Sequence, residues 1–225
     1  MNVVCGIQAR MGSSRLPGKV MMDLCGTPLI GHIIKRLKKC NKINTIVLCT
    51  STTKENKVLL NYCTSQNIET IQGDEFDVLS RYWLLIEKYM PETVVRICAD
   101  NPILDPIEID RVIEFHCQQQ ADYSFNNIPY MDNGYPDGIG AEVANAQKIM
   151  SLKNKNLNAS HREHVTQYFW DNKEEFIFKY LRAPKDIFGS KLKLDIDYLE
   201  DYQKINDIFK THYPKNNFFG IRDLI

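Results

Sequence analysis

The chain has 225 residues, and its 28 lysines and arginines balance its 28 aspartates and glutamates. This length fits a single domain with a sizeable core, and the balanced charge gives no overall basic field for nucleic acid. No apolar run reaches the roughly 18 residues of a membrane span, and the N-terminus lacks the pattern of a signal peptide. We therefore expect a cytoplasmic protein that binds neither nucleic acid nor a membrane.

Seven cysteines are spread along the chain without close spacing. No Cys-x-x-Cys pair or Cys/His cluster predicts a zinc site, and Cys5 and Cys49 lie within apolar runs. We expect all seven to be reduced thiols, mostly buried, as in a reducing compartment.

Strands and helices alternate four times in the first half of the chain. Apolar runs predict strands over residues 2–8, 45–49, 69–71 and 93–98. Apolar spacing and capping signals predict helices over 28–37, 54–65, 73–88 and 106–119, with Asp74 or Asp77 as the N-cap of the third. This alternation predicts an α/β fold with an open, mostly parallel, Rossmann-like sheet and helices on both faces. Ligands are then expected at the carboxyl ends of the strands.

The pattern is less regular after Asp122. Short strands are predicted over 123–126, 141–144, 176–181 and 191–197, and a loop rich in Asn, Pro, Asp and Gly over 127–140. A capping box with Ser160 as the N-cap and Glu163 at the third position predicts a helix that continues through Trp170. A terminal helix is predicted over 201–211.

The segment from Gln8 to Lys19 carries the strongest functional signal. Its small residues let backbone N–H groups approach an anion, and three cations lie among them. These residues are Gly12, Ser13, Ser14, Gly18, Arg10, Arg15 and Lys19. A strand, a cationic loop and then a helix form the layout that holds phosphate at the edge of an α/β sheet. The segment is not a standard P-loop, because Val20 rather than Ser or Thr follows the lysine.

Three aspartates are candidate metal ligands. Asp100 directly follows a predicted strand, and Asp195 and Asp197 are two residues apart, so they share one face of an extended segment. Carboxylates that face one another repel unless a cation lies between them, and Mg²⁺ takes one or two carboxylates together with phosphate oxygens. The alternative is that Asp195 and Asp197 are edge charges, or that Asp197 caps the last helix.

The segment Gln8–Lys19 resembles the N-terminal motif of the cytidylyltransferases that make CMP-sugars, the acylneuraminate and KDO synthetase superfamily. Its form is similar to the subgroup called spore coat polysaccharide biosynthesis protein F. Further motifs of the family have counterparts at Glu75–Arg81, Arg96–Pro102, Pro136–Gly138 with Glu142–Val143, Arg162–Thr166 and Asp195–Asp197. One departure is Tyr198-Leu199, where the subgroup often has Thr-Pro, and it affects the expected start of the last helix.

The resemblance implies transfer of CMP from CTP to a sugar acid, with release of pyrophosphate, for surface polysaccharide or glycan biosynthesis. It also implies Mg²⁺ as the cofactor, CTP and a small anionic sugar as substrates, and a homodimer. The implied catalytic residues are Arg10, Arg15, Lys19 and Asp100. The implied nucleotide-binding residues are Ala9, Arg10, Met11, Gly12, Ser13, Arg15, Lys19, Ser51, Ser80, Arg81 and Asp100. The implied acceptor-binding residues are Asp137, Glu142, Arg162 and His164, and the implied metal ligands are Asp100, Asp197 and Asp195.

These roles divide one domain, residues 1–225, into three parts. The expected parts are a nucleotide-binding half over about 1–120, an acceptor and dimerisation half over about 121–190, and a metal-ligand strand with the terminal helix over 191–225.

Two other functions share some of these features. A metal-dependent glycosyltransferase of similar α/β architecture uses a D-x-D motif, but its sugar donor carries a diphosphate, so Arg15 and Lys19 would be superfluous. A non-catalytic nucleotide-binding module would not need the metal carboxylates. The acceptor also stays open, since a phosphorylated polyol or a phosphonate fits the same residues.

Overall fold

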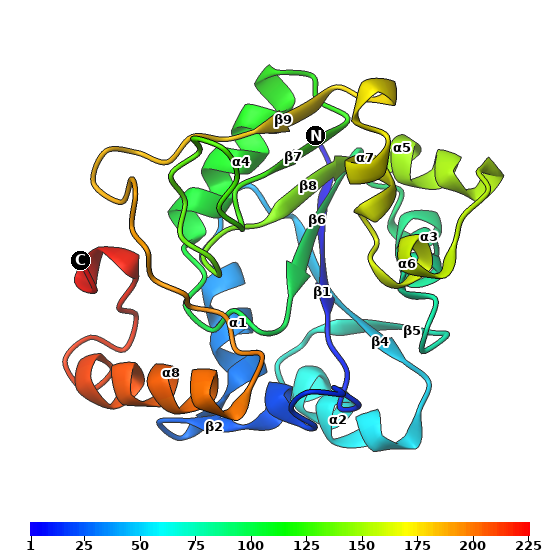
Figure 1. Cartoon of the computed structure of the whole chain (residues 1–225). Helices are drawn as coiled ribbons and strands as arrows, with labels where there is room; N and C mark the ends of the chain where they lie inside the picture. The colour runs from blue at the N-terminus through cyan, green and yellow to red at the C-terminus, as the bar shows by residue number, and fades with distance from the viewer.

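A computed structural model describes residues 1–225. Seven strands form one sheet in the order β5-β4-β1-β6-β8-β7-β9 (Figure 1). The strands are β1 (Val3–Gln8), β4 (Thr45–Ser51), β5 (Glu69–Gly73), β6 (Thr93–Cys98), β7 (Tyr123–Phe125), β8 (Glu142–Asn145) and β9 (Phe178–Tyr180). Only β8 runs antiparallel to its neighbours, so the prediction of a mostly parallel sheet is confirmed.

Helices cover both faces of this sheet (Figure 1). They are α1 (Leu29–Leu37), α2 (Lys57–Ser65), α3 (Val78–Tyr89), α4 (Pro106–Gln118), α5 (Ala146–Ser151), α6 (Ala159–Glu163), α7 (Gln167–Asp171) and α8 (Leu199–His212). Five 3₁₀ turns, η1 (Lys19–Met21), η2 (Lys54–Asn56), η3 (Leu152–Asn154), η4 (Lys173–Glu175) and η5 (Ile221–Asp223), and a hairpin of β2 (Asp23–Leu24) and β3 (Thr27–Pro28) complete the chain.

The alternation of side chains along the central strand β1 divides the interior into two cores. Val3, Cys5 and Ile7 point to one face, where α1, α4 and α8 supply the packing side chains. Val4 points to the other face, where α3, α5 and α7 pack. A strand covered on both faces must be apolar at nearly every position, which is why residues 3–7 form an unbroken apolar run.

The predicted strand over 191–197 is wrong. This segment is extended, but its sole ladder contact is an isolated parallel bridge between Lys193 and Asp137. Leu194 and Ile196 are fully buried while Asp195 and Asp197 stay partly exposed, so the alternation that suggested a strand is real. The segment packs against the loop of residues 127–140 instead of joining the sheet. A Cβ at Gly138, whose φ is +91°, would lie 2.8 Å from the backbone of Asp195, so glycine permits this packing.

The predicted capping box is also wrong. The N-cap of α6 is Asn158, whose side chain accepts a hydrogen bond from the backbone of His161, and the helix ends at Glu163. A second short helix, α7, follows it, so no continuous helix reaches Trp170. Asp74 and Asp77 were both candidates for the N-cap of α3. The N-cap is Asp77, whose side chain accepts a hydrogen bond from the backbone N–H of Ser80.

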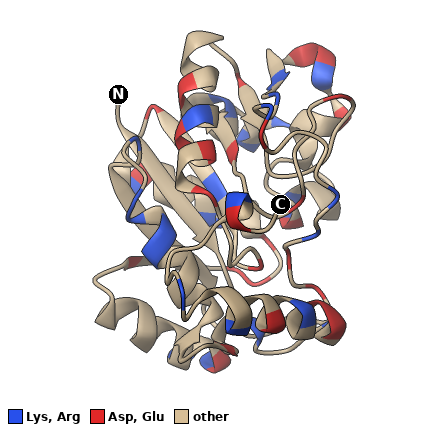
Figure 2. Cartoon of the chain, turned by 90° about the vertical axis from the view of Figure 1, so that its left-hand side faces the viewer, with Lys and Arg blue, Asp and Glu red and all other residues tan.

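Basic and acidic residues are interspersed along the ribbon in Figure 2, and their numbers are equal. No helix of the structure combines the length and the apolar composition needed to cross a membrane.

Candidate active site

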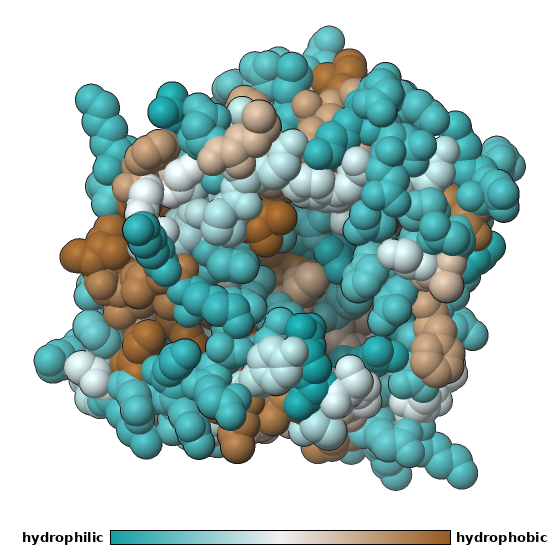
Figure 3. All heavy atoms as spheres, in the orientation of Figure 1, coloured by the Kyte–Doolittle hydropathy of each residue, from teal (hydrophilic) through white to brown (hydrophobic).

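The carboxyl ends of the two central strands, β1 and β6, form one end of a pocket of about 190 Å³. Gln8 lies opposite Cys98 at the last position of both strands, and the backbone of Ala99 donates to the carbonyl of Gln8. The face in Figure 3 is largely hydrophilic and is hollowed near its centre. The pocket is lined by Gln8, Ala9, Arg10, Ser13, Ser14, Arg15, Lys19, Val20, Cys98, Ala99, Asp100 and Glu163.

The cationic loop closes on itself between these strand ends and η1. The backbone of Gly18 donates to the carbonyl of Met11 at 2.8 Å, and Gly18 adopts the left-handed φ of +75° that this closure requires. The hydroxyl of Ser13 accepts from the backbone of Leu16. The loop thereby brings three cations, Arg10, Arg15 and Lys19, to one pocket.

The side chain of Lys19 links the cationic loop to the segment that precedes α8. Its Nζ lies 3.4 Å from Oδ2 of Asp100 and 3.3 Å from Oδ1 of Asp197, and it donates to the carbonyl of Ile196 at 2.6 Å. Arg15 contacts the other oxygen of Asp197 at 2.8 Å. The structure therefore brings together two predicted metal ligands and two predicted phosphate-binding cations, although about 180 residues of sequence separate them.

The carboxylates around Lys19 are crowded. Burial and then the nearby Asp197 and Asp195 raise the pKa of Asp100, against the opposing pull of Lys19. Burial, Asp195 and Asp100 likewise raise the pKa of Asp137 to about 6. Three cations, Arg15, Lys19 and Lys193, lie among these four carboxyl groups, so the site favours additional positive charge.

The residues fit a divalent cation, although no three His, Cys, Asp or Glu side chains are arranged as a preformed metal cluster. One oxygen of Asp195, Oδ1, is buried and has no hydrogen-bond partner. Mg²⁺ commonly binds through one or two carboxylates and completes its shell with water and substrate phosphate. Asp100 and Asp197, with Asp195 beside them, supply that donor set, and in this structure Lys19 forms ion pairs with the first two.

Arg10 is held on the opposite wall of the pocket. Its guanidinium lies 3.4 Å from a carboxylate oxygen of Glu75 and 4.0 Å from Glu163. Arg81 is buried and donates to the carbonyls of Asp74 and Glu75, each at 2.8 Å. Arg81 therefore shapes the segment that holds Arg10.

Three residues predicted to contact the base or the ribose do not line the pocket. The hydroxyl of Ser80 donates to the carbonyl of Asp77, and the guanidinium of Arg81 is engaged as described. Ser51 is fully buried at the end of β4 and bonds with Thr53 and Asn56. Met11 and Gly12 belong to the loop but contribute no lining side chain.

A second pocket, of about 390 Å³, lies beside β8 and α7. It contains two of the predicted acceptor residues, Glu142 and His164. Glu142 pairs with Arg96 and accepts from the hydroxyls of Tyr123 and Thr166. The full lining is Arg96, Asn127, Ile128, Glu142, His164, Thr166, Gln167 and Trp170.

The other two predicted acceptor residues lie outside this pocket. Asp137 belongs to the carboxylate group around Asp195. Arg162 pairs with Asp77 and so links α6 to the start of α3.

Several site residues escaped the sequence reasoning. Gln8, Cys98 and Glu163 line the first pocket, and Gln8 also accepts two hydrogen bonds from Arg96. The sequence could have indicated Gln8 as a site residue, because Gln8 is the last residue of a buried strand and ligands are expected at strand ends. Glu163 lies within the motif Arg162–Thr166, but the sequence suggested a capping role for it, and the end of α6 at this residue places it in the pocket instead.

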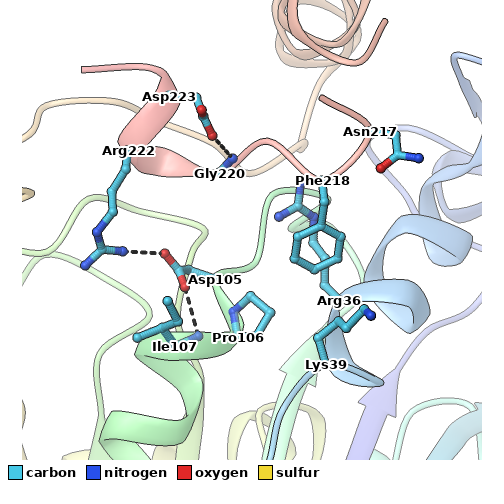
Figure 4. Close-up of a pocket in the computed structure, with 10 residues that line it drawn as sticks. All are labelled: Arg36, Lys39, Asp105, Pro106, Ile107, Asn217, Phe218, Gly220, Arg222 and Asp223. Carbon is cyan, nitrogen blue, oxygen red and sulfur yellow. Dashed lines mark hydrogen bonds and ion pairs between the residues drawn. The ribbon is translucent and has the colours of Figure 1, made fainter. Parts of the chain in front are cut away.

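Another cavity, of about 570 Å³, is a separate feature between α1, α4 and the C-terminal tail (Figure 4). Its charged groups are largely engaged within the fold. The guanidinium of Arg36 donates to the carbonyls of Leu104 and Phe219, and Arg222 pairs with Asp105. These contacts hold the C-terminal tail against the start of α4.

The fold and the first pocket define an α/β protein with a cationic loop and paired carboxylates at the carboxyl edge of its sheet, the class to which nucleotidyltransferases belong. The family model described as cytidylyltransferase matches residues 4–219. This chain belongs to the cytidylyltransferase family, and the Rossmann-like fold and the family expected from the sequence are confirmed.

Three relatives illustrate the similarity. Spore coat polysaccharide biosynthesis protein SpsF of Bacillus subtilis is 32% identical over 209 residues, covering 91% of this chain and 85% of its own. The 8-amino-3,8-dideoxy-manno-octulosonate cytidylyltransferase of Shewanella amazonensis is 22% identical over 225 residues, covering 95% and 87%. The structure of a cytidylyltransferase from Leptospira borgpetersenii has a TM-score of 0.89 at 25% identity, covering 100% of this chain and 92% of that one.

Proposed function

We propose that this protein transfers CMP from CTP to a sugar acid and releases pyrophosphate, in the biosynthesis of a surface polysaccharide or glycan. The sugar-acid acceptor is supported by the name of the Shewanella relative, and the polysaccharide role by that of the Bacillus relative. The observation that carries the chemistry is the meeting of Lys19 and Arg15 with Asp100 and Asp197 in one site.

The cations of the loop bind the triphosphate in this proposal. Lys19, Arg15 and Arg10 come from three positions around the pocket, so they can contact different phosphate groups. Charge-assisted hydrogen bonds from these side chains hold the α-phosphate beside the carboxylates. Fixing the phosphate and the acceptor together removes much of the entropic cost of the reaction.

We further propose Mg²⁺ as the cofactor, held by Asp100 and Asp197 with Asp195 as a third candidate. The ion supplies positive charge that offsets repulsion between an anionic acceptor and the α-phosphate. The buried, unpartnered Oδ1 of Asp195 supports this assignment.

The acceptor is assigned to the pocket beside β8, where Glu142 and His164 lie, with Asp137 and Arg162 as further candidates. A cytoplasmic homodimer is the proposed working form. Seven free cysteines support the reducing compartment.

The test is pyrophosphate release from each of the four common ribonucleoside triphosphates, with a panel of sugar acids, phosphorylated polyols and phosphonates. We expect release from CTP with a sugar acid. Release with a phosphorylated polyol alone would reassign the acceptor, and preference for another nucleotide would contradict the proposed donor.

A further inference from the structure

Asn56 lies at the end of η2, directly before α2, and its side chain is fully buried. An asparagine at a helix N-cap usually accepts a hydrogen bond from the first turn of that helix. Asn56 makes no such bond. Its Oδ1 instead accepts from the backbone N–H of Met11 at 2.8 Å, 45 residues away in sequence.

The amide nitrogen of Asn56 is anchored just as firmly. Nδ2 donates to the carbonyl of Ser51 at 3.0 Å, to its hydroxyl at 2.7 Å and to the hydroxyl of Thr53 at 2.9 Å. The Met11 N–H needs an acceptor and the Ser51 carbonyl needs a donor, so these partners fix the orientation of the amide. Asn56 thus bridges the end of β4 and the cationic loop.

The backbone of Met11 is hydrogen-bonded on both sides and holds the loop in position. Its N–H is bound by Asn56, and its carbonyl accepts from Gly18 where the loop closes. Arg10 precedes this peptide, and the run of small residues follows it. With both backbone groups of Met11 fixed, the approach of the loop to an anion is set before any ligand binds.

We propose that Asn56 is a positioning residue for nucleotide binding, which preorganises the phosphate-binding loop through the backbone of Met11. It touches no phosphate itself. This inference rests on the proposed function, because the loop is taken to bind the triphosphate of CTP.

The test compares Asn56→Leu, which keeps the number of side-chain heavy atoms but removes the hydrogen bonds, with Asn133→Ala as a control in another loop. Asn133 is an equally buried asparagine that fixes a different loop, accepting from the backbones of Tyr130 and Tyr135. Three quantities are measured for each protein: the Kd for CTP, the melting temperature, and exchange of the Met11 amide by NMR. Asn56→Asp serves as a second variant, since it keeps the acceptor for Met11.

We expect Asn56→Leu to weaken CTP binding by about tenfold and to expose the Met11 amide to exchange. Asn133→Ala should change neither quantity by more than about twofold at a comparable loss of stability. Asn56→Asp should keep the Met11 amide protected. The assignment is overturned if Asn56→Leu folds, exposes the Met11 amide to exchange and still binds CTP with unchanged affinity. If Asn56→Leu does not fold, increased exchange of the Met11 amide in Asn56→Asp would overturn it. A wild-type protein that binds no CTP would instead refute the proposed function, while the exchange measurement would still test the role of Asn56 in the loop.

Discussion

Lys19 and Arg15 are the residues whose removal most directly tests the phosphate pocket. Replacing either with Met removes a charge-assisted contact that is worth about 1.5–3 kcal/mol. We expect each variant to raise the Kd for CTP accordingly, as measured by calorimetry. Lys57→Met is the matched control, because Lys57 is an exposed lysine in α2 that contacts no pocket residue. Unchanged affinity in both loop variants would remove the basis for the assignment.

Asp100 and Asp197 carry the proposed metal dependence. Asn at either position keeps the shape of the side chain but removes the charge that attracts a cation. We expect severe loss of turnover, partly relieved by raised Mg²⁺, and weaker Mn²⁺ binding by titration in the presence of CTP. Asp132→Asn, an exposed aspartate outside the carboxylate group, should behave as wild type. Full activity of both variants in excess EDTA would contradict the metal mechanism.

His116 is a buried histidine that lies against the hydroxyl of Ser124. Burial lowers its pKa to about 4, against an opposing effect of Asp122. The unfolded chain binds a proton near pH 6.5 and the folded chain does not, so stability falls as the pH drops from 6.5 toward 4.

The pH effect of His116 can be isolated with His116→Gln. The difference in unfolding free energy between wild type and variant should shrink by about 3 kcal/mol between pH 7 and pH 4. Urea denaturation at several pH values measures this difference. A constant difference would show that His116 does not titrate as its burial predicts.

At the scale of elements, the C-terminal tail depends on one arginine in η5. Arg222 pairs with Asp105, with the fully buried Glu108 and with Asp186 (Figure 4 draws the first of these pairs). Its own side chain is 37% exposed, so solvent screening reduces the value of these pairs.

We expect Arg222→Met to destabilise the protein by about 2 kcal/mol, because the buried carboxylate of Glu108 loses one of its charged partners. Thermal unfolding measures the effect. Lys210→Met removes an exposed pair with Asp207 and should cost less than about 0.5 kcal/mol. Equal stability of the two variants would mean that Arg222 does not fasten the tail.

The elements of the first half were predictable, because buried parallel strands leave long apolar runs that few other structures produce. The strand over 191–197 failed for a specific reason. Leu194 and Ile196 alternate with Asp195 and Asp197 as in a strand, but alternation reports burial and not a hydrogen-bonded neighbour. The partner of this segment is a glycine-permitted loop, which local sequence does not reveal.

The sequence predicted those charged residues of the site that come shortly after a strand. Asp100 and the cations near Lys19 lie where strand ends are expected, and they meet as predicted. Asn56 and Glu163 were missed, since their neighbours are set by how η2 and α6 pack and not by their own local pattern. Arg81 and Ser80 belong to a family motif, and in the structure their polar groups donate hydrogen bonds to backbone carbonyls.

At the scale of the whole molecule, the seven cysteines reflect how the chain is packed. All are free, and burial raises the pKa of Cys49, Cys63 and Cys98 to about 12. Thiolates are the reactive form, so these three should react slowly in the folded protein. Thiol titration should find seven groups after denaturation without reductant and clearly fewer before it. Stable disulfides would overturn the proposed compartment.

Lys19 and Asp197 also have a consequence for synthesis. The lysine leaves the ribosome early, and its carboxylate partner follows 178 residues later. At about 5–20 residues per second, that interval is roughly 10–40 seconds. During this time Lys19 has no contact with Asp197 or with the carbonyl of Ile196. The proposed phosphate-binding loop and the proposed metal ligand therefore come together only after residue 197 has been synthesised, and a chain that stops before it carries the cationic loop without that ligand.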